Sequence, residues 1–464
     1  MNIALIIYLV VLVLIAVRSA RRVKDIPDFF VARKGASAKA VAGSLVATIL
    51  GGSAVIGAVD SGARLGGAAS WFMLTGALGL IALIPFAGRA YSHGKYTLPD
   101  LVENLYGKGP RFVASIVIPV AWTGIVAAQI IAAAKLLMTF TPMEYTTAAI
   151  VSAAVFTGYT LAGGQLSILR TDFFQACLII AGLLVLAGFA LFDGAGDVAG
   201  IAGATNAGAA GAATSAPTSA PPFPFHANFT PFDLFLLILT YGTTYTAGPD
   251  IFSRMFCAKD VATAKKAIAG AACTLIPVAF VIGFLAVYGV SLGEVQGARI
   301  TAIANAVLPP ALLPLFALAL LSVVLSSADT TLLSSSVIIC RLFNIGGDAV
   351  TKGRPLAKAR IVILLNGIVA LLLALVFTDI IGTLLLALAV YAGAFTVPVL
   401  WGLLGLKAKP KFVASAIVAG GALALAGKLC PPLPGSLGAH TGDFLMVAAF
   451  IVNAIILAFG REKK

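Results

Sequence analysis

Apolar runs of about 20 residues recur from one end of the chain to the other, separated by short polar stretches. A helix needs about this many apolar residues to cross the hydrocarbon core of a bilayer. The pattern therefore predicts an all-α integral membrane protein with about thirteen transmembrane helices. We expect these spans near 3–17, 38–62, 67–87, 112–139, 145–166, 172–192, 230–250, 265–291, 309–340, 359–377, 380–404, 412–428 and 442–460.

The composition supports this interpretation, with 60% hydrophobic and only 11% charged residues and a mean hydropathy of +1.05. Such values lie far from those of a soluble globular domain. Basic residues, not a small-residue cleavage site, follow the first apolar run. We therefore interpret 3–17 as a membrane helix, not as a cleaved signal, and expect a multi-pass protein of the cell (inner or plasma) membrane.

The net charge of +13 records the topology and does not indicate a nucleic-acid partner. One set of alternate loops holds 27 of the 31 Lys and Arg residues, the opposite set holds three, and Lys135 lies within a span. The positive-inside rule then places the N-terminus outside and the C-terminus in the cytoplasm. The basic set comprises 18–39, 88–111, 170, 254–266, 341–360, 407–411 and 461–464.

A Gly/Ala/Pro-rich segment at 193–229 divides the chain and is expected to be an external loop. Five predicted spans precede it and five follow. Because five is an odd number, two such groups in series cross the bilayer in opposite directions, as in inverted-repeat transporters. The expected units are 1–37 (accessory helix and first cytoplasmic loop), 38–192 (first repeat), 193–229 (loop), 230–405 (second repeat) and 406–464 (two accessory helices).

The first span of each group is interrupted at a similar place. Residues 49–57 read "ILGGSAVIG" and residues 241–250 read "YGTTYTAGPD". Matched Gly/Pro interruptions indicate broken helices around a binding site near the bilayer midplane. The alternative is that the glycines only allow close helix packing.

The segment 322–336, "SVVLSSADTTLLSSS", carries eight hydroxyls and one aspartate inside a predicted span. One or two hydroxyls would merely bond back to the helix backbone or join helices. A carboxylate within the membrane marks an ion or substrate path, and clustered oxygens suit a small hard cation such as sodium. Asp329 is therefore a candidate gate or coupling residue.

Five segments in order resemble the sodium:solute symporter family, which includes sodium-coupled proline, sugar and sialic acid transporters. Two departures concern cytoplasmic positions: the acid usual after Arg341 is absent, and Arg33-Lys34 stand where the family has glycine-arginine. The matching segments are "DFFVARKG" (28–35), "YTLPDLVENLYG" (96–107), "YTLAGGQLSILRTDFFQ" (159–175), "GPDIFSRMFCAKD" (248–260) and "SSADTTLLSSSVIICRLF" (326–343).

The resemblance implies a leucine-transporter-like fold with a 5+5 inverted repeat and a sodium site. The implied ligands are the hydroxyls of Ser326 and Ser327 with the carbonyls of Ala47, Leu50 and Val323.

Some family members have a second sodium site, which the resemblance places at Asp172 and Thr330. The alternative for Asp172 is a pair with Arg170 or a helix cap.

The solute is expected between the two repeats. Lys135 either holds a substrate carboxylate or extends toward the outer surface. The candidates facing the solute, each with packing as its alternative, are Ala54, Val55, Gln129, Tyr241, Thr244, Tyr245 and Tyr391.

These observations favour a sodium-coupled symporter that imports a small organic solute, an amino acid or a carboxylate, by alternating access. It is not expected to be an enzyme, and sodium is the only metal and no cofactor is expected. No nucleotide-binding GxxxxGK[ST] motif occurs. The alternatives are a membrane-embedded solute sensor of the same fold and a proton-coupled carrier. The sequence leaves the oligomeric state open.

Overall fold

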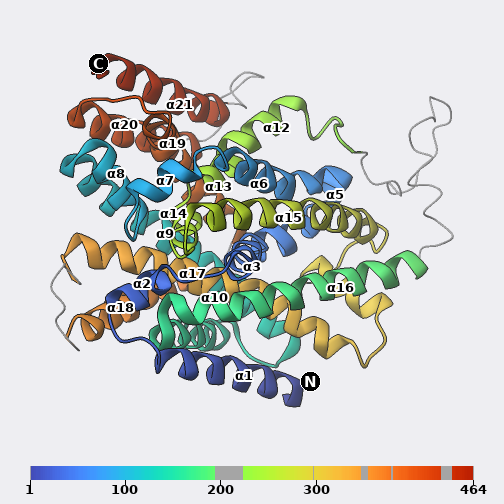
Figure 1. Cartoon of the computed structure of the whole chain (residues 1–464). Helices are drawn as coiled ribbons and strands as arrows, with labels where there is room; N and C mark the ends of the chain where they lie inside the picture. Colours follow the sequence, from blue (N-terminus) through green and yellow to red (C-terminus); the bar gives the residue numbers. More distant parts are fainter. Residues whose placement is uncertain are drawn as a thin grey trace.

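The computed structural model describes residues 2–193, 223–295, 297–345, 354–377, 380–429 and 441–462, which fold into a bundle of helices (Figure 1). Most of the expected 193–229 loop lies outside the described residues. Elements not treated separately below are α2 (Ile26–Val31), η1 (Ala32–Lys34), η3 (Gly66–Ala69), α6 (Ser70–Leu83), α7 (Ala87–His93), α8 (Leu98–Tyr106), α15 (Val261–Val290), α16 (Arg299–Val307), α18 (Arg354–Val376) and α19 (Ile380–Leu403).

Within the described ranges, nine helices are long and apolar enough to cross a membrane, or ten if a bent pair counts as one span. The remaining predicted spans also coincide with helices. The span at 3–17 is part of α1 (Asn2–Ala20), and the one beginning at 230 is divided among several short helices. The all-α membrane fold is thus confirmed.

Two of the predicted spans are joined in a single 49-residue element, α10 (Tyr145–Asp193). At 1.5 Å per residue it would measure about 74 Å, more than twice the thickness of a bilayer core. Its backbone leaves the helical region at Gly164, where φ is 54°. A Cβ at this position would lie 2.6 Å from Phe29 of α2, so both the conformation and the close packing require glycine.

The first predicted break is present. Helix α3 (Ala38–Ile49) ends at Leu50, and the chain continues into a π-helical turn, η2 (Ser53–Gly57), then α4 (Ala58–Asp60) and α5 (Gly62–Leu65). The helical segments before and after the break, Ala38–Ile49 and Ala54–Asp60, are bent by 56° relative to each other. The bend leaves backbone carbonyls near the end of α3 for other partners.

The second break divides the span that begins at 230 into four pieces: α12 (Pro231–Leu237), η4 (Ile238–Gly242), α13 (Thr243–Ala247) and α14 (Pro249–Met255). Gly248 is extended, with ψ of 137°, and Pro249 begins the next helix. Both interrupted spans therefore contain a π-helical turn, a rare helical variant that often occurs at functional sites.

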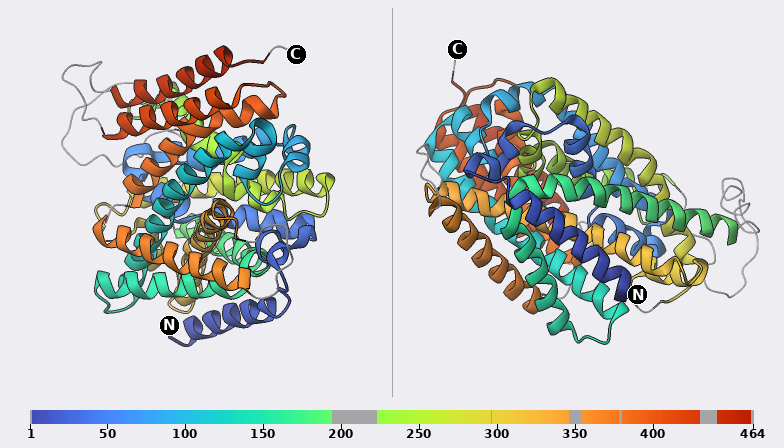
Figure 2. Two further views of the ribbon diagram at one scale, coloured as in Figure 1. Left: turned by 90° about the vertical axis from the view of Figure 1, so that its left-hand side faces the viewer. Right: turned by 60° about the horizontal axis from the view of Figure 1, so that its bottom comes forward.

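The oxygen-rich helix α17 (Leu313–Leu342) lies at the centre of the bundle and packs against α9 (Lys108–Phe140) and α10. Its residues from Ser322 to Ile338 are all buried. The terminal helices flank this core: α1 lies on one side and α20 (Pro410–Leu429) with α21 (Thr441–Phe459) on the opposite side (Figures 1 and 2).

Candidate functional site

Two neighbouring serines of α17 contact the end of the first broken helix. The Ser326 hydroxyl donates to the Ala47 carbonyl at 2.8 Å and lies 3.3 Å from the carbonyl of Val323. The Ser327 hydroxyl donates to the Thr48 carbonyl at 2.9 Å. Leu50 ends α3, and its N–H donates to Val46. The structure thus brings four of the five residues expected at the first sodium site together and adds Thr48.

Glycine at position 51 allows this approach. A Cβ built there would lie only 2.5 Å from the Ser327 hydroxyl oxygen, whereas at Gly52 it would lie 3.2 Å from Oε1 of Gln129. The glycine at the helix break therefore lets the backbone approach Ser327 closely, and the break itself leaves carbonyl oxygens for partners outside α3. The converging groups are hydroxyl and carbonyl oxygens, a donor set that fits a hard cation such as sodium.

Asp172, the aspartate of the expected second site, forms a buried ion pair. Its Oδ2 lies 3.1 Å from Nη2 of Arg254, and both side chains are fully buried. Arg254 also donates to the hydroxyl of Ser44 at 2.8 Å and to that of Thr330. Arg170 donates instead to Ser19, so the sequence-based alternative of an Asp172–Arg170 pair is wrong.

The Arg254 guanidinium thus occupies the position expected for a second sodium ion, because it contacts both Asp172 and Thr330. An ion bound by these two residues would first have to displace a cation that belongs to the chain. Arg254 was not among the candidate site residues predicted from the sequence, although "FSRMF" directly follows the second break. Its position beside Gly248-Pro249 was the available signal.

Asp329 is fully buried in the middle of α17. Its Oδ1 accepts from Thr330 at 3.2 Å, while Oδ2 has no hydrogen-bond partner among the described residues. The carboxyl group therefore retains capacity to bind a further donor or cation.

A cavity of about 50 Å³ lies beside the serine pair, between the two broken helices. It contains Ser327 and four of the expected solute residues, Gln129, Tyr241, Thr244 and Tyr245. The sequence analysis missed the other lining residues: Thr48, Ile49, Gly51, Trp122, Ile125, Asp250, Thr331, Leu384 and Leu388.

The other solute candidates lie outside the lining of this cavity. Ala54 and Val55 are buried within the first broken span. Tyr391 packs edge-on against Trp122 with ring centroids 4.6 Å apart, and its hydroxyl donates to the Ala247 carbonyl. Lys135 is exposed, which favours the alternative in which it extends away from the solute.

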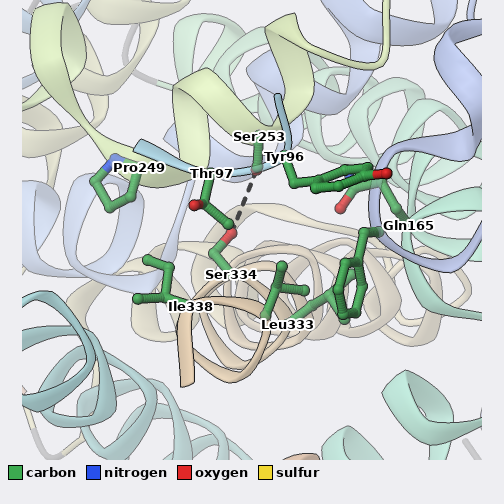
Figure 3. Close-up of a pocket in the computed structure, with 10 residues that line it drawn as sticks. Tyr96, Thr97, Gln165, Pro249, Ser253, Leu333, Ser334 and Ile338 are labelled. Atoms are coloured by element: carbon green, nitrogen blue, oxygen red, sulfur yellow. Dashed lines mark hydrogen bonds between the residues drawn. The ribbon is translucent and has the colours of Figure 1, made fainter. Parts of the chain in front are cut away.

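Two further cavities lie beyond the central one and differ in size. One, of about 220 Å³, lies near α5, α12 and α21 and contains Arg64, Phe72 and Lys428. The other is only about 10 Å³ and lies between Phe30, Tyr96 and Ile338 (Figure 3). Within it the hydroxyls of Ser253 and Ser334 approach to 3.3 Å (Figure 3).

We call the part of the molecule around the cavity of about 10 Å³ the narrow end, and the part around the cavity of about 220 Å³ the wide end. Ion pairs reinforce the narrow end. Arg341 lies 3.3 Å from Asp100 of the "TLPD" segment. Arg341 thus has an acidic partner although the acid usual at the next position is absent. Arg33 lies 2.7 Å from Asp28. The hydrogen bond from the Arg33 guanidinium holds the pKa of the Asp28 carboxyl below its usual range.

Comparison with known proteins gives a family match over most of the chain. The model of the family described as "Sodium:solute symporter family" matches residues 29–411. The sodium/proline symporter of Haemophilus influenzae is 28% identical over 171 residues, 35% of this chain and 32% of that protein. The high-affinity proline transporter of Bacillus subtilis is 33% identical over 106 residues, 22% of each. The alignments thus span at most about a third of these curated relatives.

Solved structures match nearly the full length. A Na⁺-coupled sialic acid symporter in a substrate-bound, outward-open state superposes with a TM-score of 0.78 at 18% identity, over 100% of this chain and 99% of that one. Mhp1, a nucleobase-cation-symport-1 family transporter in a closed conformation, gives 0.57 at 16% identity, over 93% and 94%. The predicted leucine-transporter-like fold is confirmed.

Proposed function

The chain belongs to the sodium:solute symporter family, and from this premise we propose that it imports a small organic solute together with sodium. One observation carries the proposal: Ser327 both bonds the first broken helix and lines the central cavity. Sodium at Ser326 and Ser327 therefore changes the wall of the solute site. Two ligands that share a wall residue alter each other's affinity reciprocally.

Sodium binds at the hydroxyls of Ser326 and Ser327 and the carbonyls near the end of α3. In this arrangement sodium coordinates the carbonyl oxygens of Ala47 and Thr48, which in the structure accept hydrogen bonds from the two serine hydroxyls. The second candidate site, Asp172 with Thr330, is held by Arg254, so we assign the coupling ion to the first site. Sodium moving inward gains about 2.3 kcal/mol per 100 mV of membrane potential, which supplies the driving force for solute uptake.

Alternating access follows from two five-helix repeats, 38–192 and 230–405, that rearrange around the central cavity. The narrow end, with Phe30 and Tyr96, faces the cytoplasm, and the wide end, with Arg64, faces outside. The distribution of Lys and Arg supports this orientation. Single cysteines introduced at Arg64 or at Lys407, in a variant whose five native cysteines are replaced by serine, test it: a membrane-impermeant maleimide added to intact cells should label only the first.

The test of the ion site is thermal unfolding of purified protein in NaCl and in KCl of equal concentration. Sodium should raise the unfolding midpoint of the native protein but not that of a Ser326→Ala/Ser327→Ala variant. At a concentration 100 times the dissociation constant, a ligand stabilises by about 2.7 kcal/mol. A Ser335→Ala/Ser336→Ala variant is the matched control, because these hydroxyls of the same helix bond Asn366.

A sodium-dependent rise that survives in the Ser326→Ala/Ser327→Ala protein would contradict the site. A native protein indifferent to sodium would instead favour a solute sensor or a proton-coupled carrier.

A further inference from the structure

Two buried polar atoms in the central cavity have no hydrogen-bond partner among the described residues. They are Nε1 of Trp122, a donor, and Oε1 of Gln129, an acceptor. The side chains are 1% and 3% exposed. They lie seven residues apart on α9, which places them on one face of the helix. Because buried polar groups are nearly always paired, this pair points to a ligand with both an acceptor and a donor.

Two threonine hydroxyls of the cavity lining add acceptors, since their protons are already committed. Thr244 donates to the Thr240 carbonyl at 2.7 Å, and Thr331 to the Ser327 carbonyl at 2.7 Å. Both oxygens therefore retain lone pairs but no free proton for a ligand.

The charge of the lining points the same way. Among the described residues that line this cavity, Asp250 is the one acidic side chain, and there is no Lys, Arg or His. A buried ammonium group needs a carboxylate or several acceptors to offset its loss of water. A solute carrying only a carboxylate would meet Asp250 with no basic side chain in the described lining, because Arg254 lies behind it and donates to the Asp250 carbonyl.

The volume sets an upper size. On this measure a single water needs about 10–15 Å³ and an apolar cavity of about 150 Å³ holds benzene, whereas this cavity is about 50 Å³. Even a compact solute the size of benzene therefore requires this cavity to enlarge about threefold, and a large sugar acid requires a still larger opening.

Building on the symporter function above, we propose that the solute is a small zwitterionic amino acid. Its ammonium group binds Asp250 and Oε1 of Gln129, and its carboxylate accepts from Nε1 of Trp122. Sodium beside Ser327 supplies the positive charge that the cavity wall lacks. The amine, and not the carboxylate, is then the feature that selects the solute.

Matched probes separate the two groups. L-proline, cyclopentanecarboxylate and pyrrolidine share a five-membered ring and carry both groups, the carboxylate alone and the amine alone. L-alanine, propionate and ethylamine form a second such set, and D-glucose serves as a neutral probe. The measurement is the shift in thermal unfolding midpoint of the purified native protein, with each probe in NaCl and in KCl.

We expect at least one of the two amino acids to stabilise in NaCl, with a dissociation constant at least tenfold lower than that of its amine-free analogue. Equal or stronger binding of the carboxylates or glucose, or no shift with either amino acid, would overturn the proposal. Equal binding of the amines and the amino acids would overturn the role of Trp122. An amino-acid shift of equal size in KCl would leave the solute class standing and defeat sodium coupling.

Two conservative variants assign the groups. Trp122→Phe keeps the ring that packs on Tyr391 and removes the N–H, and should weaken amino-acid binding about fivefold without changing the shift caused by sodium alone. Trp401→Phe is the control, because Nε1 of Trp401 also has no hydrogen-bond partner in the described part of the chain but Trp401 is not among the residues that line this cavity. Asp250→Asn should weaken amino-acid binding at least tenfold. Unchanged binding in both cavity variants would exclude these contacts.

Discussion

The two broken helices take part in the central site in different ways. The first offers backbone atoms to the serines of α17, because the carbonyls of Ala47 and Thr48 accept from them, and it also forms part of the cavity wall. The second offers side chains: Tyr241, Thr244 and Tyr245 line the cavity. In the proposed mechanism, similar interruptions in the sequence thus produce an ion-binding half built mainly on main chain and a solute-binding half built mainly on side chains.

The two halves therefore tolerate different amino-acid substitutions. Carbonyl oxygens are the same in every residue, so the ion-binding half constrains the shape of the chain more than its side chains, as Gly51 illustrates. Side chains carry the chemical identity of the solute-binding half, so a new solute requires different residues there. Arg254 links the two broken helices, because it follows the second break yet contacts Ser44 of the first broken helix.

The largest effect is expected for Arg254→Met, which removes this link between the broken helices. Asp172 would remain fully buried without its counter-charge, and breaking a buried ion pair costs about 3–5 kcal/mol. The free energy of unfolding, measured by denaturant titration in detergent, should fall by about this amount. An Arg254→Met/Asp172→Asn variant should recover most of the loss; a double variant as unstable as the single one would show that the charge is not the cause.

Gly51→Ala tests the backbone character of the ion-binding half. The added Cβ would approach the Ser327 hydroxyl to 2.5 Å, so the sodium-dependent stabilisation, about 2.7 kcal/mol at 100 times the dissociation constant, should disappear. Gly158→Ala is the control, because nothing lies within 4 Å of a Cβ there. Sodium stabilisation of native size in the Gly51 variant would mean that the close approach is unnecessary.

Thr244→Val sharpens the solute side with the smallest expected effect. The variant keeps the volume and removes one acceptor of the cavity wall, a loss of about 1 kcal/mol, or roughly fivefold in solute affinity, with sodium affinity unchanged. Titration of the solute at saturating sodium measures this. Thr243→Val is the control, because that hydroxyl bonds Thr396 at 3.0 Å, outside the cavity. Equal effects of both substitutions would argue against a direct contact of Thr244.

Hydrophobic periodicity was sufficient to predict the spans, and Gly/Pro interruptions to predict both breaks, because these follow from local composition. The oxygen-rich composition indicated the segment 322–336, whereas the choice of Ser326 and Ser327 within it came from the family resemblance. Trp122, Asp250 and Arg254 were not predictable, because their roles depend on which helices become neighbours. Arg254 in particular contacts residues 76, 82 and 210 positions away along the chain.

The Arg254–Asp172 pair also matters for the unloaded protein. In the proposed cycle the carrier returns to its outward-facing state after releasing sodium and solute. A carboxylate left without a positive partner would hinder that return or bind another cation. A tethered guanidinium cannot dissociate, so Asp172 stays neutralised at every stage. The hydroxyl and carbonyl oxygens at Ser326 and Ser327 carry no net charge when sodium leaves. Return without cargo therefore leaves no new unpaired charge at either of these two positions.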